Sequence, residues 1–340
     1  MNIQYLFLSF ADLKNRTYVI LQDPDKILKS GLELYADVLL SNPLVKEDDK
    51  NHAVCLAIVD GQIAGRMMLF PTRLRVGNGI LPIQTGGGLI VSKKFRCNGI
   101  GTTIINKVRV ENPFDLYYGA LFSRPAYDKI RRTNIMLEIP QYVKERYSGL
   151  KKILELPLLF RLRYLKKRFI VKKLSIVPEW AGQMATSDSH KYYEVHDTKW
   201  LQWALDNTAT GIDTDYQTFY AIYNREDEPI GFFMSKIRSV VKNGESFVKA
   251  NIVEWASANL SVLSEADINI LSLETFDPVV KRVWTISESI ETGKKLKWYS
   301  FKRRGWLAMS VKDKKGQFPD IGDVSQWRIR YGCCNTVLVE

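Results

Sequence analysis

Apolar and polar residues follow two different spacings along the chain, and each spacing predicts one type of secondary structure. Residues 23–43 carry apolar side chains at helical spacing up to Pro43, which predicts an amphipathic helix. Residues 53–70 form two apolar runs around Asp60-Gly61. Because a tight hairpin turn needs residues that tolerate positive φ, this pair predicts a β-hairpin.

The next segments predict a strand, a loop, a helix and another strand. Residues 83–92 (IQTGGGLIVS) indicate a strand, and apolar residues return at helical spacing from Thr102 to about Val110. Residues 115–122 indicate a short buried strand. Residues 123–134 then begin like a helix, with Ser123 as the cap and a proline in the first turn.

Part of this order recurs later in the chain. Residues 219–235 can be aligned with residues 55–69. Each segment has an apolar strand that contains Ala-Ile, then an acidic turn, then a second strand that begins near Ile and Gly. Gly231 is the counterpart of Gly65 in this alignment. The residue that follows Gly231 by the same number of positions as Arg96 follows Gly65 is Val262, and no pair of glycines occurs there. The sequence therefore predicts a diverged second copy that lacks the glycine loop.

Composition divides the chain in the same way. A length of 340 residues suggests two domains, all eight tryptophans lie after residue 179, and nine of the 21 glycines fall between Gly61 and Gly101. We expect a first domain at 1–147, a basic linker at 148–178 and a second domain at 179–340.

The positive charge is concentrated in one segment. The net charge is +12, and residues 144–173 hold eleven Lys and Arg against two Asp and Glu. A connector that packs its apolar side between domains is the first interpretation of this segment. The alternative is an amphipathic stretch at 149–174 that makes weak contact with an anionic membrane surface. We expect no specific nucleic-acid partner, because no known binding motif accompanies the charge.

Cysteine and histidine usage favours a reducing compartment without a bound metal. The four cysteines and three histidines are scattered and form neither a disulfide framework nor a zinc signature. The N-terminus has no basic start, and no apolar run reaches membrane-spanning length. The sequence thus predicts a cytoplasmic protein.

The loop Arg96-Cys97-Asn98-Gly99-Ile100-Gly101 comes directly before the helix at Thr102. Amide groups at a helix start bind phosphate oxygens when no side chain blocks them, and Lys93 and Lys94 add positive charge. A loop that only turns a strand into a helix is the simpler alternative. Neither the dinucleotide-binding nor the P-loop glycine motif is present.

Together with the hairpin and strand before it, this loop resembles the GNAT family of acetyl-CoA-dependent N-acyltransferases, whose pyrophosphate loop reads Arg/Gln-x-x-Gly-x-Gly/Ala. The resemblance implies an α/β (α+β) fold with a mixed, largely antiparallel twisted sheet and flanking helices, here in two tandem GNAT-like copies. It implies acetyl-CoA or another acyl-CoA as the bound donor. The residues expected to bind it are Leu89, Ile90, Val91, Arg96, Cys97, Asn98, Gly99, Ile100, Gly101, Thr102 and Ser123.

The resemblance is weaker for the catalytic groups. The family often has Asn-x-x-Ala and, about four residues on, a Tyr that protonates the leaving thiol; here that position is Ile130. Tyr127 is the nearest phenol and the candidate catalytic residue, with a core or surface aromatic as its alternative interpretation. Residues 83–92 carry no acidic side chain that could act as base.

The leading hypothesis is an N-acyltransferase in which a small amine, such as an amino sugar, attacks the thioester directly. In the second domain, Trp and Tyr rings could stack on a sugar, and Asp213, Asp215 and Glu254 could hold a cationic amine. One alternative is a non-catalytic protein that binds acyl-CoA or a partner. Another is an aminoacyl transferase that uses charged tRNA.

Overall fold

The computed structural model describes residues 2–16, 22–23, 32–46, 50–121, 127–128, 130–146, 155–207, 215–242 and 244–333. The chain forms two compact units. Unit 1 contains Met1–Leu137, Ala308–Asp323 and Cys334–Glu340, and unit 2 contains Glu138–Leu307 and Val324–Cys333.

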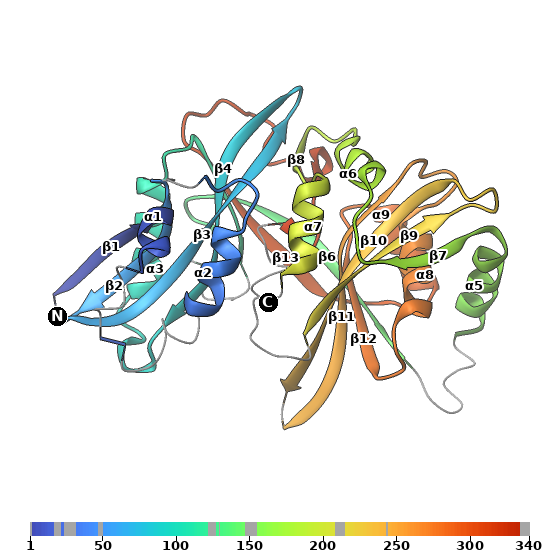
Figure 1. Ribbon diagram of the computed structural model, residues 1–340, viewed down its shortest axis with the longest axis horizontal. Helices are drawn as coiled ribbons and strands as arrows, with labels where there is room; N and C mark the ends of the chain where they lie inside the picture. Colours follow the sequence, from blue (N-terminus) through green and yellow to red (C-terminus); the bar gives the residue numbers. More distant parts are fainter. Residues whose placement is uncertain are drawn as a thin grey trace. The chain divides into compact units, whose positions relative to one another are not determined.

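Unit 1 has a sheet with the strand order β1-β2-β3-β4-β5-β13 (Figure 1); among its described strands the β4–β5 contact alone is parallel. The strands are β1 (Ile3–Ser9), β2 (His52–Val59), β3 (Gln62–Val76), β4 (Gly79–Val91), β5 (Leu116–Leu121) and the end of β13 (Lys302–Asp313). The helical elements are α1 (Phe10–Lys14), α2 (Leu32–Leu40), the 3-10 turn η2 (Lys93–Phe95) and α3 (Ile100–Glu111).

The predicted hairpin and the predicted strand–loop–helix order are confirmed. Asp60 and Gly61 turn β2 into β3 with φ values of 49° and 74°, as a tight turn requires. Strand β4 leads through η2 into α3, which connects it to β5. Of the helix predicted at 23–43, Leu32–Leu40 is helical, and residues 24–31 lie outside the described residues.

Helix α3 packs closely on the sheet because β3 has a glycine at the contact. Ile100, Ile104 and Val108 of α3 are buried in the core of unit 1. A Cβ atom added to Gly65 would lie 3.0 Å from the Ile90 carbonyl oxygen, 3.3 Å from Ile104 Cδ1 and 3.4 Å from Ile100 Cγ2. Gly65 therefore sets how near the first turns of α3 come to β3 and β4.

Unit 2 has a sheet with the order β6-β12-β11-β10-β9-β7, and within the described residues of that sheet the β11–β12 contact alone is parallel. Its strands are β6 (Ile135–Glu145), β7 (Ile170–Leu174), β9 (Tyr216–Tyr223), β10 (Pro229–Lys242), β11 (Glu245–Ser257) and β12 (Val280–Ile286). The short strands β8 (Tyr192–Glu194) and β14 (Trp327–Arg328) pair in parallel. The helices are α5 (Leu156–Arg168), α6 (Glu179–Thr186), α7 (Thr198–Asp206), α8 (Glu265–Thr275), α9 (Ile290–Trp298) and the 3-10 turn η4 (Val324–Gln326).

The two strand orders correspond position by position. In unit 1 the order runs β1-β2-β3-β4-β5-β13, and in unit 2 it runs β7-β9-β10-β11-β12-β6. The parallel pair is joined by one helix in each unit, α3 in the first and α8 in the second. The segments that looked alike in sequence thus form the same β-hairpin, β2–β3 in one unit and β9–β10 in the other.

The unit boundaries differ from those predicted at 147 and 178. The first segment of unit 1 ends at Leu137, so residues 138–145 of β6 belong to unit 2. Residues 308–323 belong to unit 1 again. Composition and motif order describe contiguous stretches of chain, so they cannot reveal a strand that joins a distant stretch.

The predicted basic linker contains a helix and an edge strand of unit 2. Leu158, Leu162 and Leu165 of α5 are buried in the core of unit 2. Two hydrogen bonds of 2.8 Å, from the Nε and Nη2 atoms of Arg161, hold the Asp267 carboxylate of α8. Strand β7 pairs with β9.

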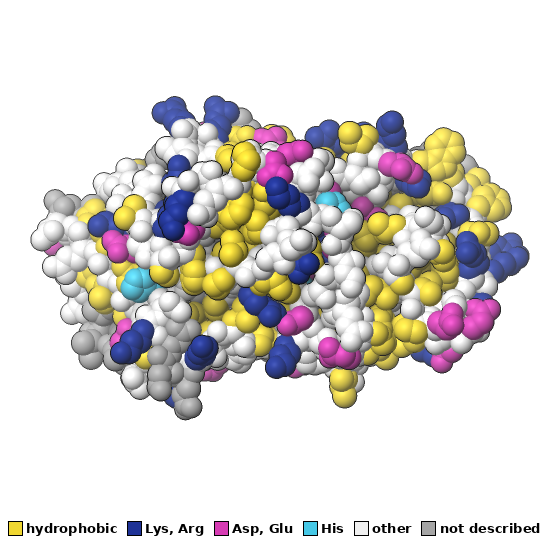
Figure 2. Space-filling model, turned by 90° about the horizontal axis from the view of Figure 1, so that it is seen from above, with side chains coloured by type: hydrophobic (Ala, Val, Ile, Leu, Met, Phe, Trp, Pro, Cys, Tyr) yellow, Lys and Arg dark blue, Asp and Glu magenta, His cyan; other side chains and the backbone are white. Residues whose placement is uncertain are grey.

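The other side of α5 is exposed and carries Leu159, Phe160 and Tyr164. Contact of this segment with a membrane surface stays a prediction, as does the absence of a nucleic-acid partner. On the face drawn in Figure 2, Lys and Arg side chains lie in several separate groups. Within the described residues, no helix is long and apolar enough to cross a membrane.

We predict that Gly65→Val destabilises unit 1, because its side chain would enter the contact between β3, Ile90 and α3. Overpacking of this kind costs about 1–3 kcal/mol, so the midpoint of thermal unfolding should fall by several degrees. Gly79→Val is the control, because the nearest atom to an added Cβ is 3.7 Å away and the site is exposed. Equal midpoints for the two variants would contradict the close approach.

Candidate functional site

Helix α3 begins without a side-chain cap. Its N-cap is Gly99, and the first hydrogen bond within the helix runs from Thr103 N to Gly99 O at 3.0 Å. The backbone N–H groups of Ile100 and Gly101 precede that bond, and no acidic residue lies in the first turn. Such a helix start carries partial positive charge and donors that point out of the helix.

The loop before α3 is exposed and positively charged. Arg96, Cys97, Asn98 and Gly99 are all exposed, as are Lys93 and Lys94. Arg96 Nε donates to the Val91 carbonyl at 3.2 Å and Asn98 Nδ2 to the Phe95 carbonyl at 3.3 Å, so both side chains hold the loop against its own backbone.

Left-handed backbone conformations shape this loop. Cys97 has a φ of 69° and Gly99 a φ of 75°. A Cβ atom added to Gly99 would meet no atom within 4 Å. At Gly101, an added Cβ would lie 3.4 Å from Val91 Cγ2 and 3.6 Å from Leu89 Cδ2, so this glycine faces the end of β4. Bare backbone N–H groups thus adjoin open space, which suits an anion of phosphate chemistry.

Strands β4 and β5 separate beside this helix start. Their parallel register contains one pair among the described residues, Thr85 with Tyr118. Burial along β4 changes at the same place, because Ile83 is 1% exposed whereas Leu89 is 36% and Ile90 is 41% exposed. The end of β4 therefore presents apolar side chains and an unpaired backbone edge. An extended apolar chain could add to that edge like a further strand.

A β-bulge interrupts β4 at the point of separation. Arg66 pairs with Ile90 and Met68 with Gly87, so β3 places one residue opposite Gly88 and Leu89. Gly88 has a φ of 60°, and its carbonyl lies 3.5 Å from Nη1 of Arg66, whose side chain is buried. The bulge leaves one residue outside the regular ladder and bends the strand, so β4 changes direction here at its exposed end.

Two phenols, one on β5 and one on the segment that follows β5, differ in position. Tyr127, the candidate from the sequence, is half-buried, and its ring lies against the Arg131 guanidinium at 5.8 Å. Tyr117 of β5 is buried, and its hydroxyl oxygen would lie 3.0 Å from a Cβ added to Gly86 and 3.2 Å from one added to Gly119. Its phenol thus occupies space that two glycines leave open where β4 and β5 part.

The loop and the strand before it lie where the sequence predicted them, and their role in binding a cofactor stays a prediction. The bulge, Arg66 and Tyr117 were not predicted from the sequence. The glycine run 86–88 was the available signal for the bulge and for the space around Tyr117. Ser123, the remaining residue expected near the phosphates, lies outside the described residues, as does Asp213.

The counterpart of this helix start in unit 2 has the opposite chemistry. Helix α8 follows β11 as α3 follows β4, but Ser264 caps it through a reciprocal pair of hydrogen bonds with Asp267. Glu265 and Asp267 also place carboxyl groups in its first turn. The Ser264–Asp267 pair satisfies the helix start internally, and the Asp267 carboxylate opposes a second anion.

Two carboxylates that were expected to hold a cationic amine are already paired in unit 2. Glu254 is fully buried and contacts His196, and its pKa is held low by His196, Arg328 and Arg330 against the upward effect of burial. Asp215 is buried, accepts a 3.0 Å hydrogen bond from Ser239 N and lies 3.8 Å from Arg238 Nε. Neither carboxylate is open to a small amine.

The fold is that of the GNAT N-acyltransferases. A conserved protein of unknown function from Enterococcus faecalis V583, described as a probable N-acyltransferase, is similar with a TM-score of 0.56 and 13% identity, covering 94% of this chain and 74% of that one.

Saccharomyces cerevisiae N-myristoyltransferase with bound myristoyl-CoA is similar with a TM-score of 0.55 and 9% identity, covering 92% of this chain and 82% of that one. A GCN5-related N-acetyltransferase from Anabaena variabilis ATCC 29413 has a TM-score of 0.53 and 10% identity, covering 92% and 73%. No model of a known family and no curated protein matches the sequence. The similarity at these identities is one of fold.

Burial at the start of α8 generates a pH-dependent contribution to stability. Glu265 is surrounded by Glu288, Arg330, Thr292 and Ser287, whose hydroxyl donates to Glu265 Oε2 at 2.9 Å. Burial, reinforced by the Glu288 charge, raises the pKa of Glu265 from 4.5 to about 7. Between these values the folded state binds more protons than the unfolded state, so stability falls as the pH rises toward 7.

We predict that Glu265→Gln removes the loss of stability that Glu265 causes as the pH rises. From pH 5 to pH 8 the free energy of unfolding of the variant, relative to the original protein, should rise by on the order of 2 kcal/mol. Urea unfolding at the two pH values measures the difference. Glu274→Gln, at the exposed end of the same helix, should show little such change. A difference for Glu265→Gln that stays constant with pH would contradict the raised pKa.

Proposed function

We propose that the protein is an acyl-CoA-dependent N-acyltransferase that transfers an acyl group to a small amine. The observation that carries this proposal is the uncapped, glycine-lined start of α3 directly beside the exposed end of β4. A pyrophosphate and an extended apolar arm, which acyl-CoA combines in one molecule, are the two ligand features that these neighbouring surfaces fit.

The residues present fit such a donor in three ways. The open space at Gly99 admits phosphate oxygens to the N–H groups of Gly99, Ile100 and Gly101. The basic side chains of the loop raise the local concentration of an anionic ligand. Leu89, Ile90 and Val91 offer apolar contact to the arm, because the edge of β4 beyond Thr85 has no register partner on β5 among the described residues.

When bound, acyl-CoA supplies an activated acyl group as a thioester. The chain's own contribution is alignment along β4 and polarisation of the thioester carbonyl by the backbone N–H at the Gly88-Leu89 bulge. Tyr117 is our candidate to protonate the departing thiolate, because it lies where β4 and β5 part. Since β4 carries no acidic residue, water accepts the proton of the attacking amine in this proposal.

We propose further that the two units are tandem copies and that unit 2 has lost its phosphate site. Their matching strand orders and the self-capped start of α8 support this. An amino sugar stays the predicted acceptor class, and a cytoplasmic location stays a prediction of the sequence. Four of the eight tryptophans are buried and two are half-buried, so in this proposal sugar stacking falls to exposed rings such as Trp298 and Trp306.

We predict that acetyl-CoA or a longer acyl-CoA raises the midpoint of thermal unfolding, since a ligand at 100 times its Kd stabilises by about 2.7 kcal/mol. Gly99→Glu should abolish the increase, because its carboxylate would occupy the phosphate site. Gly77→Glu is the matched control: Gly77 also has positive φ and no atom within 4 Å of an added Cβ, but lies in the β3–β4 turn. An increase retained by Gly99→Glu would contradict the site.

We predict that Tyr117→Phe lowers kcat about 100-fold with little change in the KM for acyl-CoA, as expected for loss of a proton donor. Tyr127→Phe should leave kcat unchanged. CoA release measured across a panel of amines provides the assay. A lower kcat in Tyr127→Phe and an unchanged kcat in Tyr117→Phe would make Tyr127 the acid. Binding of acyl-CoA without turnover of any amine would support a non-catalytic acyl-CoA-binding protein instead.

A further inference from the structure

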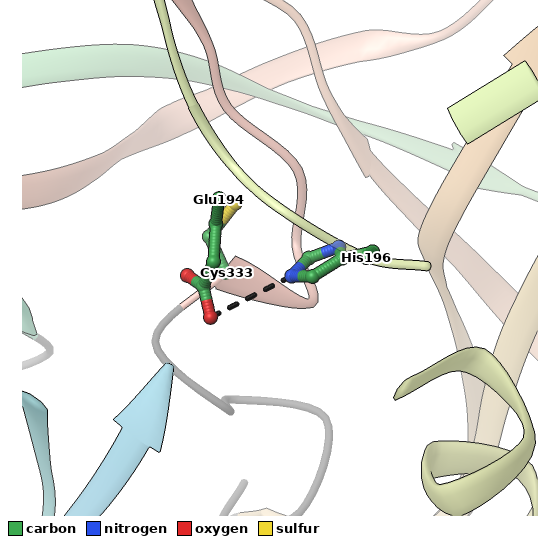
Figure 3. A group of neighbouring side chains, drawn as sticks. All are labelled: Glu194, His196 and Cys333. Carbon is green, nitrogen blue, oxygen red and sulfur yellow. Dashed lines mark ion pairs between the residues drawn. The ribbon is translucent and has the colours of Figure 1, made fainter. Parts of the chain in front are cut away.

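Three side chains with metal-binding groups converge inside unit 2. Glu194 ends β8, His196 follows two residues later, and Cys333 belongs to the last segment of the unit. One ligand atom of each lies within 4.8 Å of the other two. All three residues are buried, with exposures of 1%, 0% and 2%. Figure 3 shows the His196 ring turned toward the Glu194 carboxylate, with Cys333 beside that glutamate.

The His196 ring is held in one orientation, and one of its nitrogens makes an ion pair but no hydrogen bond with any described residue. Its Nδ1 atom contacts Oε2 of Glu254, and the ring stacks on Trp200 with centroids 3.5 Å apart. Its Nε2 atom is buried and has no hydrogen-bond partner among the described residues. The distance of 3.6 Å from Nε2 to Oε1 of Glu194 is too long for a hydrogen bond. A buried polar atom that lacks a hydrogen bond is costly, and a ligand at this point would remove that cost.

The spacing suits a metal ion between these atoms. Bonds from Zn²⁺ to histidine nitrogen and carboxylate oxygen are about 2.0–2.2 Å, so two ligands of a tetrahedral site lie about 3.3–3.6 Å apart. The 3.6 Å between Glu194 and His196 agrees with this separation. Cys333 supplies a third donor of the kind that Zn²⁺ accepts, and its sulfur also receives a 3.3 Å hydrogen bond from Arg330 N.

Glu254 completes an arrangement that is typical of metal-bound histidines. A ligating imidazole usually donates its second N–H to a carboxylate, which fixes the tautomer and the ring. Glu254 has that position relative to His196. We propose that Glu194, His196 and Cys333 bind one Zn²⁺ ion in unit 2, with Glu254 as the orienting partner of the histidine.

Such an ion would fasten the last segment of unit 2 to the segment around β8. The two segments already meet through the short β8–β14 pairing of Tyr192 with Trp327 and Tyr193 with Arg328. The sequence predicted no metal because residues 194, 196 and 333 have no recognisable spacing. Only the fold brings the cysteine to the other two ligands.

The test measures metal content and spectrum on the full chain. The protein purified without chelator should contain one Zn²⁺ per chain, and removing the ion should lower the midpoint of thermal unfolding. Replacement with Co²⁺ should give a thiolate-to-cobalt charge-transfer band, and X-ray absorption should show one sulfur at about 2.3 Å with lighter ligands at about 2.0–2.2 Å. Glu254→Gln should weaken Zn²⁺ binding about 10- to 100-fold.

Matched variants separate this site from other histidines and cysteines. His196→Gln and Cys333→Ser should lose the ion, whereas His190→Gln and Cys97→Ser should keep it. If His196→Gln and Cys333→Ser fail to fold, the cobalt spectrum and X-ray absorption of the unmodified chain still show whether a thiolate binds the ion. Two outcomes overturn the proposal: no stoichiometric Zn²⁺ after loading the unmodified chain, or loss of the charge-transfer band in Cys334→Ser but not in Cys333→Ser. In the first case the cluster is an ion pair of protonated His196 with its two glutamates.

Discussion

A helix that starts without a cap leaves backbone donors that must be satisfied from outside the helix, and α3 is such a helix. Everything proposed for unit 1 follows from that constraint. Gly99 supplies a backbone conformation that other residues adopt only with strain and leaves its donors open. Gly65 lets the same helix lie against β3, so the open donors stay beside the end of β4.

Few residues distinguish the start of α3, the proposed ligand site, from the self-capped start of α8. Both helices connect a parallel strand pair in sheets of matching order. In α8 the Ser264–Asp267 pair uses the donors that α3 leaves open, and Arg161 of α5 neutralises the aspartate. The charge of α5, for which a connector was the first interpretation and a membrane contact the alternative, is thereby partly used inside its own unit.

The sequence predicted the order of elements, the hairpin turn and the loop, because each depends on residues close together in the chain. Asp60-Gly61 and the spacing from Arg96 to Gly101 carry that information locally. The bulge at Gly88, the position of the Tyr117 hydroxyl and the convergence of Cys333 with His196 depend on packing between distant strands. No local pattern encodes such contacts, and the same reason explains the displaced unit boundaries.

The place of β13 has a consequence for synthesis on the ribosome. Residues 308–313 complete the sheet of unit 1 by pairing with β5, yet they are made about two hundred residues after it. Until then the nascent chain exposes a β5 edge with unpaired backbone groups, a known route to aggregation. Unit 1 therefore completes its sheet only after residues 308–313 have been made, and a fragment that stops at residue 147 would lack its sixth strand.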